Sequence, residues 1–236
     1  MTSELVTVIR QALADNANPE KASGMRAYMK SAMPYRGVQT PIRRKLVRAA
    51  LRAHPLTTRE DWLAAVRELW RNAAYREERY AAQDVTGAPQ FRAYRDLDIL
   101  PLYEEMVVSG AWWDLVDDVA THKLRELVDR YPNEMAAHMR AWSTDPDLWK
   151  RRSSIICQVK RKEATDLVLL CDCIEPNLAA PDFFIRKAIG WALRDLAWTD
   201  LATVEDYVAR NADRLSTLSK REALKNADTI RAGRPR

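Results

Sequence analysis

The sequence predicts an all-α fold in which antiparallel helix pairs stack into an array. Only 6 glycines occur in 236 residues, and apolar residues recur at helical spacing with almost no period-two alternation. Paired helices recur about every 35–45 residues, the size range of HEAT-like units, which favours a HEAT-like repeat solenoid. A helical bundle is the competing architecture. More than ten helices are expected here, which is many for one bundle but easily accommodated in a stacked array.

Local signals mark where the expected helices begin and end. Asn18-Pro19 and Thr40-Pro41 pair a capping side chain with a proline in the first turn, and Thr58 provides another cap. Gly110 is expected to stop one helix, and Asp145-Pro146 interrupts the pattern before another. In chain order, the expected helices cover about 5–13, 19–31, 41–51, 59–70, 73–86, 97–109, 113–122, 124–131, 132–142, 148–164, 165–175, 182–197, 201–211 and 219–227.

Apolar stripes at helical spacing justify these ranges, as in the first stripe, which ends at Leu13, and in a later one with two tryptophans, Trp62 and Trp70. The helices are joined by short turns, which favour antiparallel neighbours. We therefore expect one HEAT-like domain over residues 1–228, followed by a basic, disordered tail over residues 229–236.

Composition is that of an ordinary soluble globular protein, with 47% hydrophobic and 30% charged residues. The net charge of +5 permits a nucleic-acid partner without requiring one. The sequence shows no secretory signal and no apolar run near the roughly 18–20 residues that a membrane span needs. The expected location is the cytoplasm, with no membrane association.

The cysteines and histidines predict neither a disulfide framework nor a metal site. The three cysteines are Cys157, Cys171 and Cys173, and no histidine lies near them in sequence. We interpret them as structural thiols. The chain also lacks a glycine-rich phosphate loop, an H-E-x-x-H motif and a Ser/His/Asp arrangement. No metal and no organic cofactor are expected.

Trp113 and Asp117 form the most informative pair. They lie one helical turn apart, so an indole and a carboxylate share one helix face. A fixed carboxylate stabilises positive charge that develops on a sugar when an N-glycosidic bond breaks, and indole faces favour cationic groups. The alternative is a core tryptophan beside a solvent-exposed aspartate, which is the commoner arrangement.

Basic residues gather in short clusters, several of them in the first turns of expected helices. Positive side chains are unfavourable there unless an anion lies near, because helix N-termini already carry partial positive charge. Helix N-termini with Arg and Lys side chains make phosphate sites, although each cluster alone fits a solvated face. The clusters are Arg43-Arg44-Lys45, Lys150-Arg151-Arg152, Lys160-Arg161-Lys162, Arg186-Lys187 and Lys220-Arg221.

Taken together, these segments resemble the AlkD-type DNA alkylation repair proteins, which are HEAT-like-repeat DNA glycosylases. No single piece is specific, but the set occurs in the same order over about residues 18–223. The matching stretches are 18–22, 27–30, 37–41 with Arg43-Arg44, 67–70, 112–114 with Val116-Asp117, 148–149 with Arg152, 183–185 with 187–191, and 218–223.

The resemblance implies a role for each matching side chain. It places the catalytic aspartate on Asp117, two sugar-facing tryptophans on Trp113 and Trp191, and an arginine that contacts the DNA backbone on Arg152. The other DNA-binding residues, taken from the matching positions and the basic clusters, are Tyr28, Gln39, Arg43, Arg44, Lys150, Phe183, Phe184, Lys187, Lys220 and Arg221.

The function implied by the resemblance is hydrolysis of the N-glycosidic bond of cationic 3- and 7-alkylpurines in duplex DNA. The base would not be flipped into a pocket. Whether bulky adducts are also substrates is left open. The enzyme would be a monomeric, monofunctional glycosylase of a bacterial type, associated with the nucleoid through its concave basic face. The alternative is a non-catalytic HEAT-type module that binds DNA or protein. Two segments, 32–36 and 121–125, depart from the family pattern and leave lesion preference open.

Overall fold

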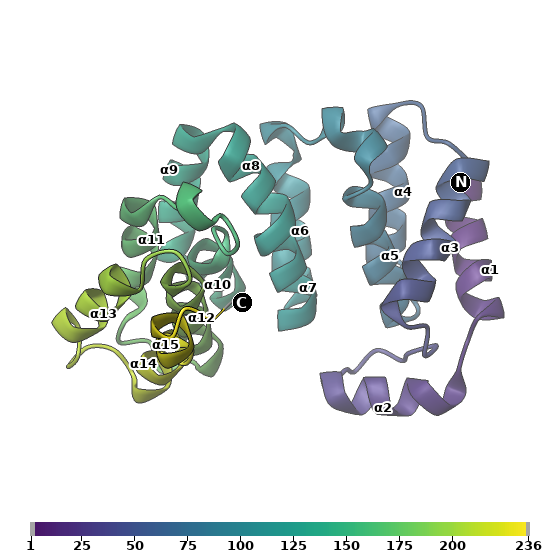
Figure 1. Ribbon diagram of the computed structural model, residues 1–236. Helices are drawn as coiled ribbons and strands as arrows, with labels where there is room; N and C mark the ends of the chain where they lie inside the picture. Colours follow the sequence, from purple (N-terminus) through teal and green to yellow (C-terminus); the bar gives the residue numbers. More distant parts are fainter. Residues whose placement is uncertain (1–2, 235–236) are drawn as a thin grey trace. The chain divides into compact units, whose positions relative to one another are not determined.

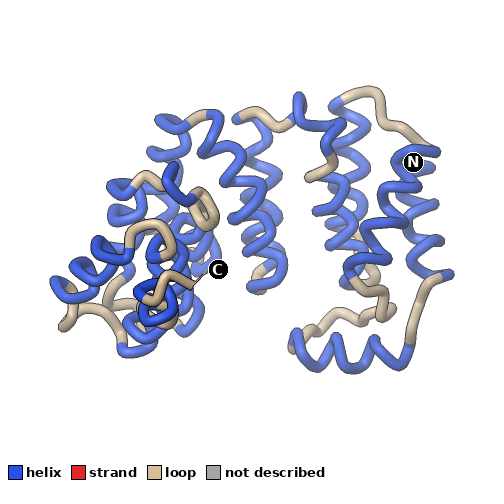
Figure 2. Tube along the Cα trace, in the orientation of Figure 1, coloured by secondary structure: helices blue, strands red, loops and turns tan. Residues whose placement is uncertain are grey.

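The computed structural model describes residues 3–234 and contains helices but no strand in that range (Figures 1 and 2). Contacts divide the chain into two compact units, unit 1 (Met1–Asp96) and unit 2 (Leu97–Arg236). The helices pack largely in pairs, so the all-α class and the paired, repeat-like arrangement are confirmed. The concave basic face stays a prediction.

Unit 1 consists of four helices that pack on one another and a fifth, α2, that lies crosswise to them (Figure 1). Trp62 and Trp70 are fully buried in its core, whereas α2 buries none of its residues. The helices are α1 (Glu4–Asp15), α2 (Pro19–Met29), α3 (Thr40–Ala53), α4 (Arg59–Arg71) and α5 (Arg76–Thr86), followed by the 3₁₀ segment Pro89–Tyr94.

Unit 2 continues the pairing, with α9 against α10 and α11, and α12 against α10 and α14. The closest approach is at Gly190 of α12, where an added Cβ would lie 2.4 Å from the Cβ of Glu222 on α14. The helices are α6 (Leu100–Gly110), α7 (Trp113–Asp118), α8 (Arg125–Arg130), α9 (Pro132–Ser143), α10 (Leu148–Ile156), α11 (Leu167–Ile174), α12 (Phe183–Ala197), α13 (Leu201–Arg210), α14 (Thr217–Ala223) and α15 (Ala227–Arg231).

Asn18 and Thr58 form the expected helix caps, whereas Thr40 and Gly110 do not take their expected positions at helix ends. Asn18 and Thr58 accept hydrogen bonds from the backbone N–H groups of Lys21 and Asp61, both at 3.1 Å. Thr40 is the first residue of α3 rather than its cap, and the capping position falls on Gln39 without a side-chain hydrogen bond. The residue that ends α6 in a left-handed conformation is Ala111 (φ 42°) rather than Gly110.

Two expected helix boundaries were wrong. The break expected between 122 and 124 is absent, because the π-helical segment Val119–Leu124 joins α7 directly to α8. The helix expected over 148–164 ends at Ile156, and both Lys160 and Lys162 have positive φ, which a continuing helix does not allow.

The chain end also differs from the expected tail. The short helix α15 runs through Arg231, and buried Ala227 anchors it, so a disordered tail from residue 229 is wrong over the described part; residues 235–236 lie outside the described range. A single domain over 1–228 stays a prediction, because a repeat array divides into compact units without ceasing to be one domain. No helix in the described range is long and apolar enough to span a bilayer.

The loop before α3 is fixed by one buried carboxylate. Glu77 of α5 is fully buried and accepts hydrogen bonds from the backbone N–H groups of Arg36, Gly37 and Val38, at 2.8–3.1 Å to its Oε1. Gly37 has φ +82°, and a Cβ there would lie 2.0 Å from the carbonyl oxygen of Asn18. The loop therefore needs both this carboxylate and this glycine.

Replacing Glu77 with alanine should lower the free energy of unfolding by about 3 kcal/mol, because it leaves buried backbone donors without an acceptor. Denaturant unfolding followed by circular dichroism measures the loss. Glu60→Ala is the matched control, because Glu60 is exposed in the first turn of α4, and its cost should stay below about 1 kcal/mol. Equal losses in the two variants would contradict this account of the loop.

Candidate functional site

Asp117 and Arg152 form a bidentate ion pair inside unit 2. Arg152 donates from Nε to Oδ1 of Asp117 at 2.7 Å and from Nη2 to Oδ2 at 2.8 Å. The Arg152 side chain is 6% exposed and the Asp117 side chain 16% exposed. The carboxylate is therefore held in one orientation, with an edge still open to solvent.

The same guanidinium joins three helices. Nη1 of Arg152, on α10, donates to the backbone carbonyl of Phe184 on α12 at 2.7 Å, while Nε and Nη2 hold Asp117 on α7. Since a guanidinium carries five N–H groups, these bonds leave one N–H on each terminal nitrogen. Arg152 can therefore position Asp117 and still has one N–H group on each terminal nitrogen with which to bind an anion.

Burial raises the pKa of Asp117 above its ordinary value of 3.8, and the neighbouring carboxylates Asp114 and Asp118 raise it further. The hydrogen bonds and charge of Arg152 act in the opposite direction and keep the ionised form accessible. Because the folded-state pKa is raised, ionising Asp117 costs stability as the pH rises through that pKa. The site therefore holds a charge that folding alone would disfavour.

Trp113 and Trp191 lie on the helices that carry this pair. Trp113 is the first residue of α7, one turn before Asp117. Trp191 follows Phe184 by seven residues on α12, close to two full turns, so the two side chains share a side of that helix. Both indoles are half-buried rather than enclosed in the core. Contact of both indoles with one bound sugar stays a prediction.

An aromatic cluster adjoins the ion pair. The ring of Phe184 lies 5.3 Å from Trp112 and 5.0 Å from Trp149, between ring centroids. Phe183 meets Phe184 edge-on at 5.4 Å and is 57% exposed. No functional role is predicted from the sequence for Trp112 or Trp149. Sequence spacing could have placed both residues near the site, because Trp149 precedes Arg152 by one helical turn and Trp112 adjoins Trp113.

The π-helical segment after Asp117 carries a second ion pair. Lys123, whose side chain is 5% exposed, binds the carboxylate of Asp118, and the hydroxyl of Thr121 donates to the backbone carbonyl of Asp117 at 2.7 Å. Such segments are rare and occur often at functional sites. Here Lys123 offsets the charge of Asp118, one of the carboxylates that raise the pKa of Asp117.

Most of the cations predicted to bind DNA have partners within the chain. Arg43 and Arg44 both bind Asp84, and Lys150 binds Glu104 and Asp145. The anions that these helix N-termini require are therefore supplied within the chain, and phosphate binding at α3 and α10 stays a prediction. Lys187 binds Glu222, and Lys220 donates to the carbonyl of Ala212, whereas Arg221 is exposed.

The predicted DNA-binding residues fall in both units. Tyr28, Gln39, Arg43 and Arg44 belong to unit 1, and the other predicted residues belong to unit 2. Tyr28 is 75% exposed on α2, and Gln39 is exposed while its side-chain oxygen accepts a hydrogen bond from Lys21 at 2.8 Å. Both side chains are thus accessible to a partner.

The described residues contain no group of three His, Cys, Asp or Glu side chains that could hold a metal ion. All three cysteines are free, with Cys157 and Cys173 buried and Cys171 half-buried. Burial raises the pKa of each thiol. A protonated, enclosed thiol is a poor nucleophile, which agrees with a structural role.

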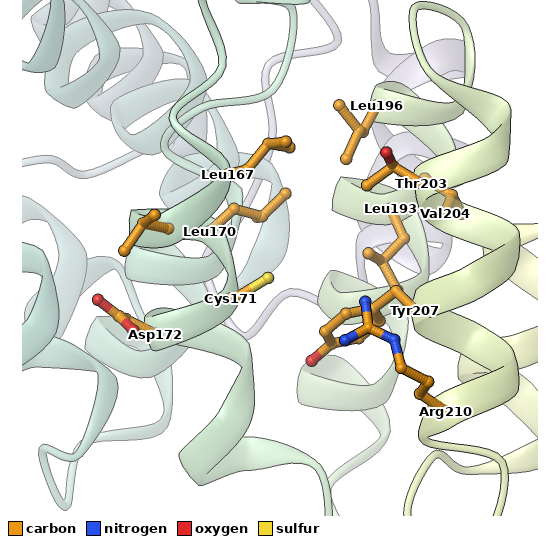
Figure 3. A pocket seen from close by; sticks show the side chains of 11 residues that line it. Leu167, Leu170, Cys171, Asp172, Leu193, Leu196, Thr203, Val204, Tyr207 and Arg210 are labelled. Carbon is orange, nitrogen blue, oxygen red and sulfur yellow. The ribbon is translucent and has the colours of Figure 1, made fainter.

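An apolar cavity of about 360 Å³ lies between α11, α12 and α13 (Figure 3). Leucine and valine side chains line most of it, and the thiol of Cys171 points inward. The charged residues of its lining, Asp172 and Arg210, are paired with Arg140 and Asp206. The cavity shares no lining residue with the Asp117–Arg152 pair, so it is not part of the same site.

The fold and this site define an all-α protein of paired helices in which Arg152 of α10 holds an acidic side chain of α7. The chain matches the family model for DNA alkylation repair enzymes over residues 9–227 and belongs to that family. A solved structure from Enterococcus faecalis, described as a predicted DNA alkylation repair enzyme, is 29% identical with a TM-score of 0.80. The match covers 89% of this chain and 95% of that one. No curated protein matches the chain.

The ion pair gives a stability prediction with a pH dependence. Arg152→Met leaves Asp117 buried without its cation and should lower the free energy of unfolding by about 3 kcal/mol at pH 7. The loss in free energy of unfolding should be smaller at pH 5, because a protonated Asp117 needs no cation. Denaturant unfolding at both pH values measures this.

The control is Arg210→Met, which breaks an exposed pair on α13 with Asp206. It should cost less than about 1 kcal/mol at either pH. A deficit in Arg152→Met that is equal at pH 5 and pH 7 would show that lost packing, rather than the uncompensated carboxylate, causes it.

Proposed function

We propose that this protein is a DNA glycosylase that hydrolyses the N-glycosidic bond of cationic alkylated purines in duplex DNA. The observation that carries the proposal is the orientation of Asp117, a mostly buried carboxylate that Arg152 holds by two hydrogen bonds with one edge open. Membership of the DNA alkylation repair family supports a damaged-DNA substrate.

The chemistry suits one fixed carboxylate. The bond between C1′ of the sugar and the purine nitrogen breaks, and its electron pair leaves with the base. A purine alkylated at N3 or N7 is already cationic, so it departs as a neutral base without a strong general acid. The sugar is left as an oxocarbenium-like cation that Asp117 stabilises at short range. Water adds to C1′ and loses a proton, which gives the abasic site.

The surrounding side chains have separate tasks in this proposal. Trp113 and Trp191 pack against the deoxyribose, where indole faces favour the developing positive charge. Arg152 positions Asp117, and its two remaining N–H groups face the adjacent phosphate. The sugar and the carboxylate do the reacting, so the base need not enter a pocket, and bulky adducts are compatible with the same site.

The proposed partner is duplex DNA carrying alkylated bases, bound by a monomer near the nucleoid. Among the predicted contacts, Arg221, Tyr28 and Phe183 are exposed, and we propose that they meet the DNA directly. The cations of Arg43, Lys150 and Lys187 reach phosphate only by sharing or leaving their carboxylate partners. No lysine is assigned to Schiff-base chemistry, so the enzyme is monofunctional.

Asp117→Asn should abolish release of 7-methylguanine from methylated duplex DNA while DNA affinity stays within about threefold. The amide keeps the shape of the side chain but removes the charge that stabilises the sugar cation, and losing one such group costs about 10²–10³ in rate. Quantifying released bases by chromatography, beside a DNA-binding titration, measures both effects.

Equal release by the Asp117→Asn variant would remove Asp117 from the catalytic role. Absence of release from any tested lesion by the unmodified protein, with DNA binding retained, would favour the alternative, a non-catalytic helical-repeat module that binds DNA. Asp206→Asn serves as the matched control, because Asp206 is exposed on α13 and outside the Asp117–Arg152 site, and this variant should release bases as the unmodified protein does.

Base release should decline as the pH falls through the Asp117 pKa, because only the ionised carboxylate stabilises the cation. Because burial raises the pKa of Asp117, this decline in rate should lie above pH 3.8, the ordinary pKa of the group. Lys123→Met removes the positive charge that contacts Asp118, so it should move the decline in rate to higher pH, whereas exposed Lys225→Met should not. The measurement is the release rate against pH after subtraction of protein-free depurination, and identical profiles for the two variants would refute the electrostatic role of Lys123.

A further inference from the structure

Unit 1 contains a cavity beneath α2, lined by two arginines, that the proposed base excision does not use. Its volume is about 400 Å³, and it lies between the first half of α2 and the loop that ends at Arg36. Side chains that line it include Ser23, Arg26, Tyr35, Arg36 and Tyr75. Because α2 buries none of its own residues, the space beneath it is not filled by a packed helix face.

Arg36 is held in place from both ends. Its backbone N–H donates to the buried carboxylate of Glu77 at 3.1 Å, and its carbonyl accepts a hydrogen bond from the backbone of Asn18 at 2.7 Å. Its guanidinium carbon lies 3.8 Å from the centre of the Tyr75 ring. A guanidinium stacked flat on a ring keeps its N–H groups in the ring-parallel plane, free to meet a planar or tetrahedral anion edge-on.

One donor of Arg36 has no acceptor. Its Nε is buried and finds no hydrogen-bond partner among the described residues. Buried charged donors normally have a partner, since burial removes the hydrogen bonds that they would make to water. A guanidinium fixed by its backbone and by Tyr75, yet short of an acceptor, is arranged for a ligand that supplies one.

The cavity lining is positively charged. Arg26 and Arg36 both line it, and no lining residue among those described is acidic. Arg26 is itself positioned by hydrogen bonds from Nε to the carbonyl of Ser31 at 3.2 Å and from Nη2 to that of Ala32 at 3.5 Å. The nearby carboxylate of Glu77 is occupied by the backbone of residues 36–38. Two fixed cations without a counter-charge favour an anion between them.

We propose that this cavity is a phosphate-binding site, in which Arg36 grips the phosphate through its guanidinium edge and Arg26 provides the second charge. Phosphate matches the arginine fork in geometry and charge. The phosphate belongs either to a DNA backbone or to a free phosphomonoester such as a nucleotide, which the volume accommodates. Neither Asp117 nor base excision takes part, so this site stands or falls independently of the proposed function.

The test is a titration of the whole protein with inorganic phosphate and with thymidine monophosphate, followed by NMR of the arginine Nε–H signals. We expect a saturable shift of the Arg36 signal. Arg36→Gln should weaken binding by tenfold or more, and Arg36→Lys, which keeps the charge but loses the fork and the stack, should weaken it by a smaller factor. The control is Arg52→Gln, because Arg52 is exposed on α3 and outside the cavity lining, and it should bind as the unmodified protein does.

A second arm identifies the source of the phosphate. The dissociation constant for undamaged duplex DNA is measured against salt concentration for the same variants. If the site binds the DNA backbone, Arg36→Gln lowers the slope of log K against log[salt] by about 0.9, the value of one phosphate. If the slope is unchanged while the titration saturates, the ligand is a free phosphomonoester. No saturable phosphate binding by the unmodified protein, or an equal loss in Arg52→Gln, overturns the proposal.

Discussion

The site of unit 2 depends on one buried ion pair. A carboxylate that is only 16% exposed would normally take up a proton, because desolvation penalises its charged form. Arg152 offsets this penalty with two hydrogen bonds to Asp117, and it ties both side chains to α12 through the carbonyl of Phe184. Three helices thus share one guanidinium, and the orientation of the carboxylate, the aromatic cluster and the position of α12 follow from it.

The charges around Asp117 shift its pKa in opposite directions. Asp114 and Asp118 raise its pKa, whereas Arg152 lowers it, and Lys123 limits the influence of Asp118. A group that must stabilise a cation has to be ionised near neutral pH, yet it acts most strongly where water is excluded. Burial with paired charges reconciles these needs. The Lys123–Asp118 contact spans five residues and bridges most of the π-helical segment Val119–Leu124, which thereby belongs to the electrostatics of the site.

The sequence predicts features that depend on residues within one helical turn, but not contacts between residues that are far apart in the chain. The caps at Asn18 and Thr58 and the shared face of Trp113 and Asp117 depend on residues within one turn, so spacing alone predicted them. The Arg152–Asp117 pair joins positions 35 residues apart, and Asp84 reaches Arg43 over 41. No local pattern encodes such partners. The same limit explains why basic clusters at helix N-termini suggested phosphate where the chain supplies its own carboxylates.

Those internal partners change what the basic residues can contribute to DNA binding. Releasing Arg43 from Asp84 or Lys150 from Glu104 leaves a carboxylate near the phosphate that replaces it, so the exchange gains little Coulomb energy and retains a like-charge repulsion. The total of 38 Lys and Arg residues therefore overstates the positive surface that is available to DNA, because the cations among them that are paired with carboxylates are already neutralised. Cations whose counter-charge is absent, as in the cavity of Arg26 and Arg36, bind an anion without that competition. Affinity for a phosphate backbone should accordingly be concentrated in a few uncompensated arginines rather than spread over every basic cluster.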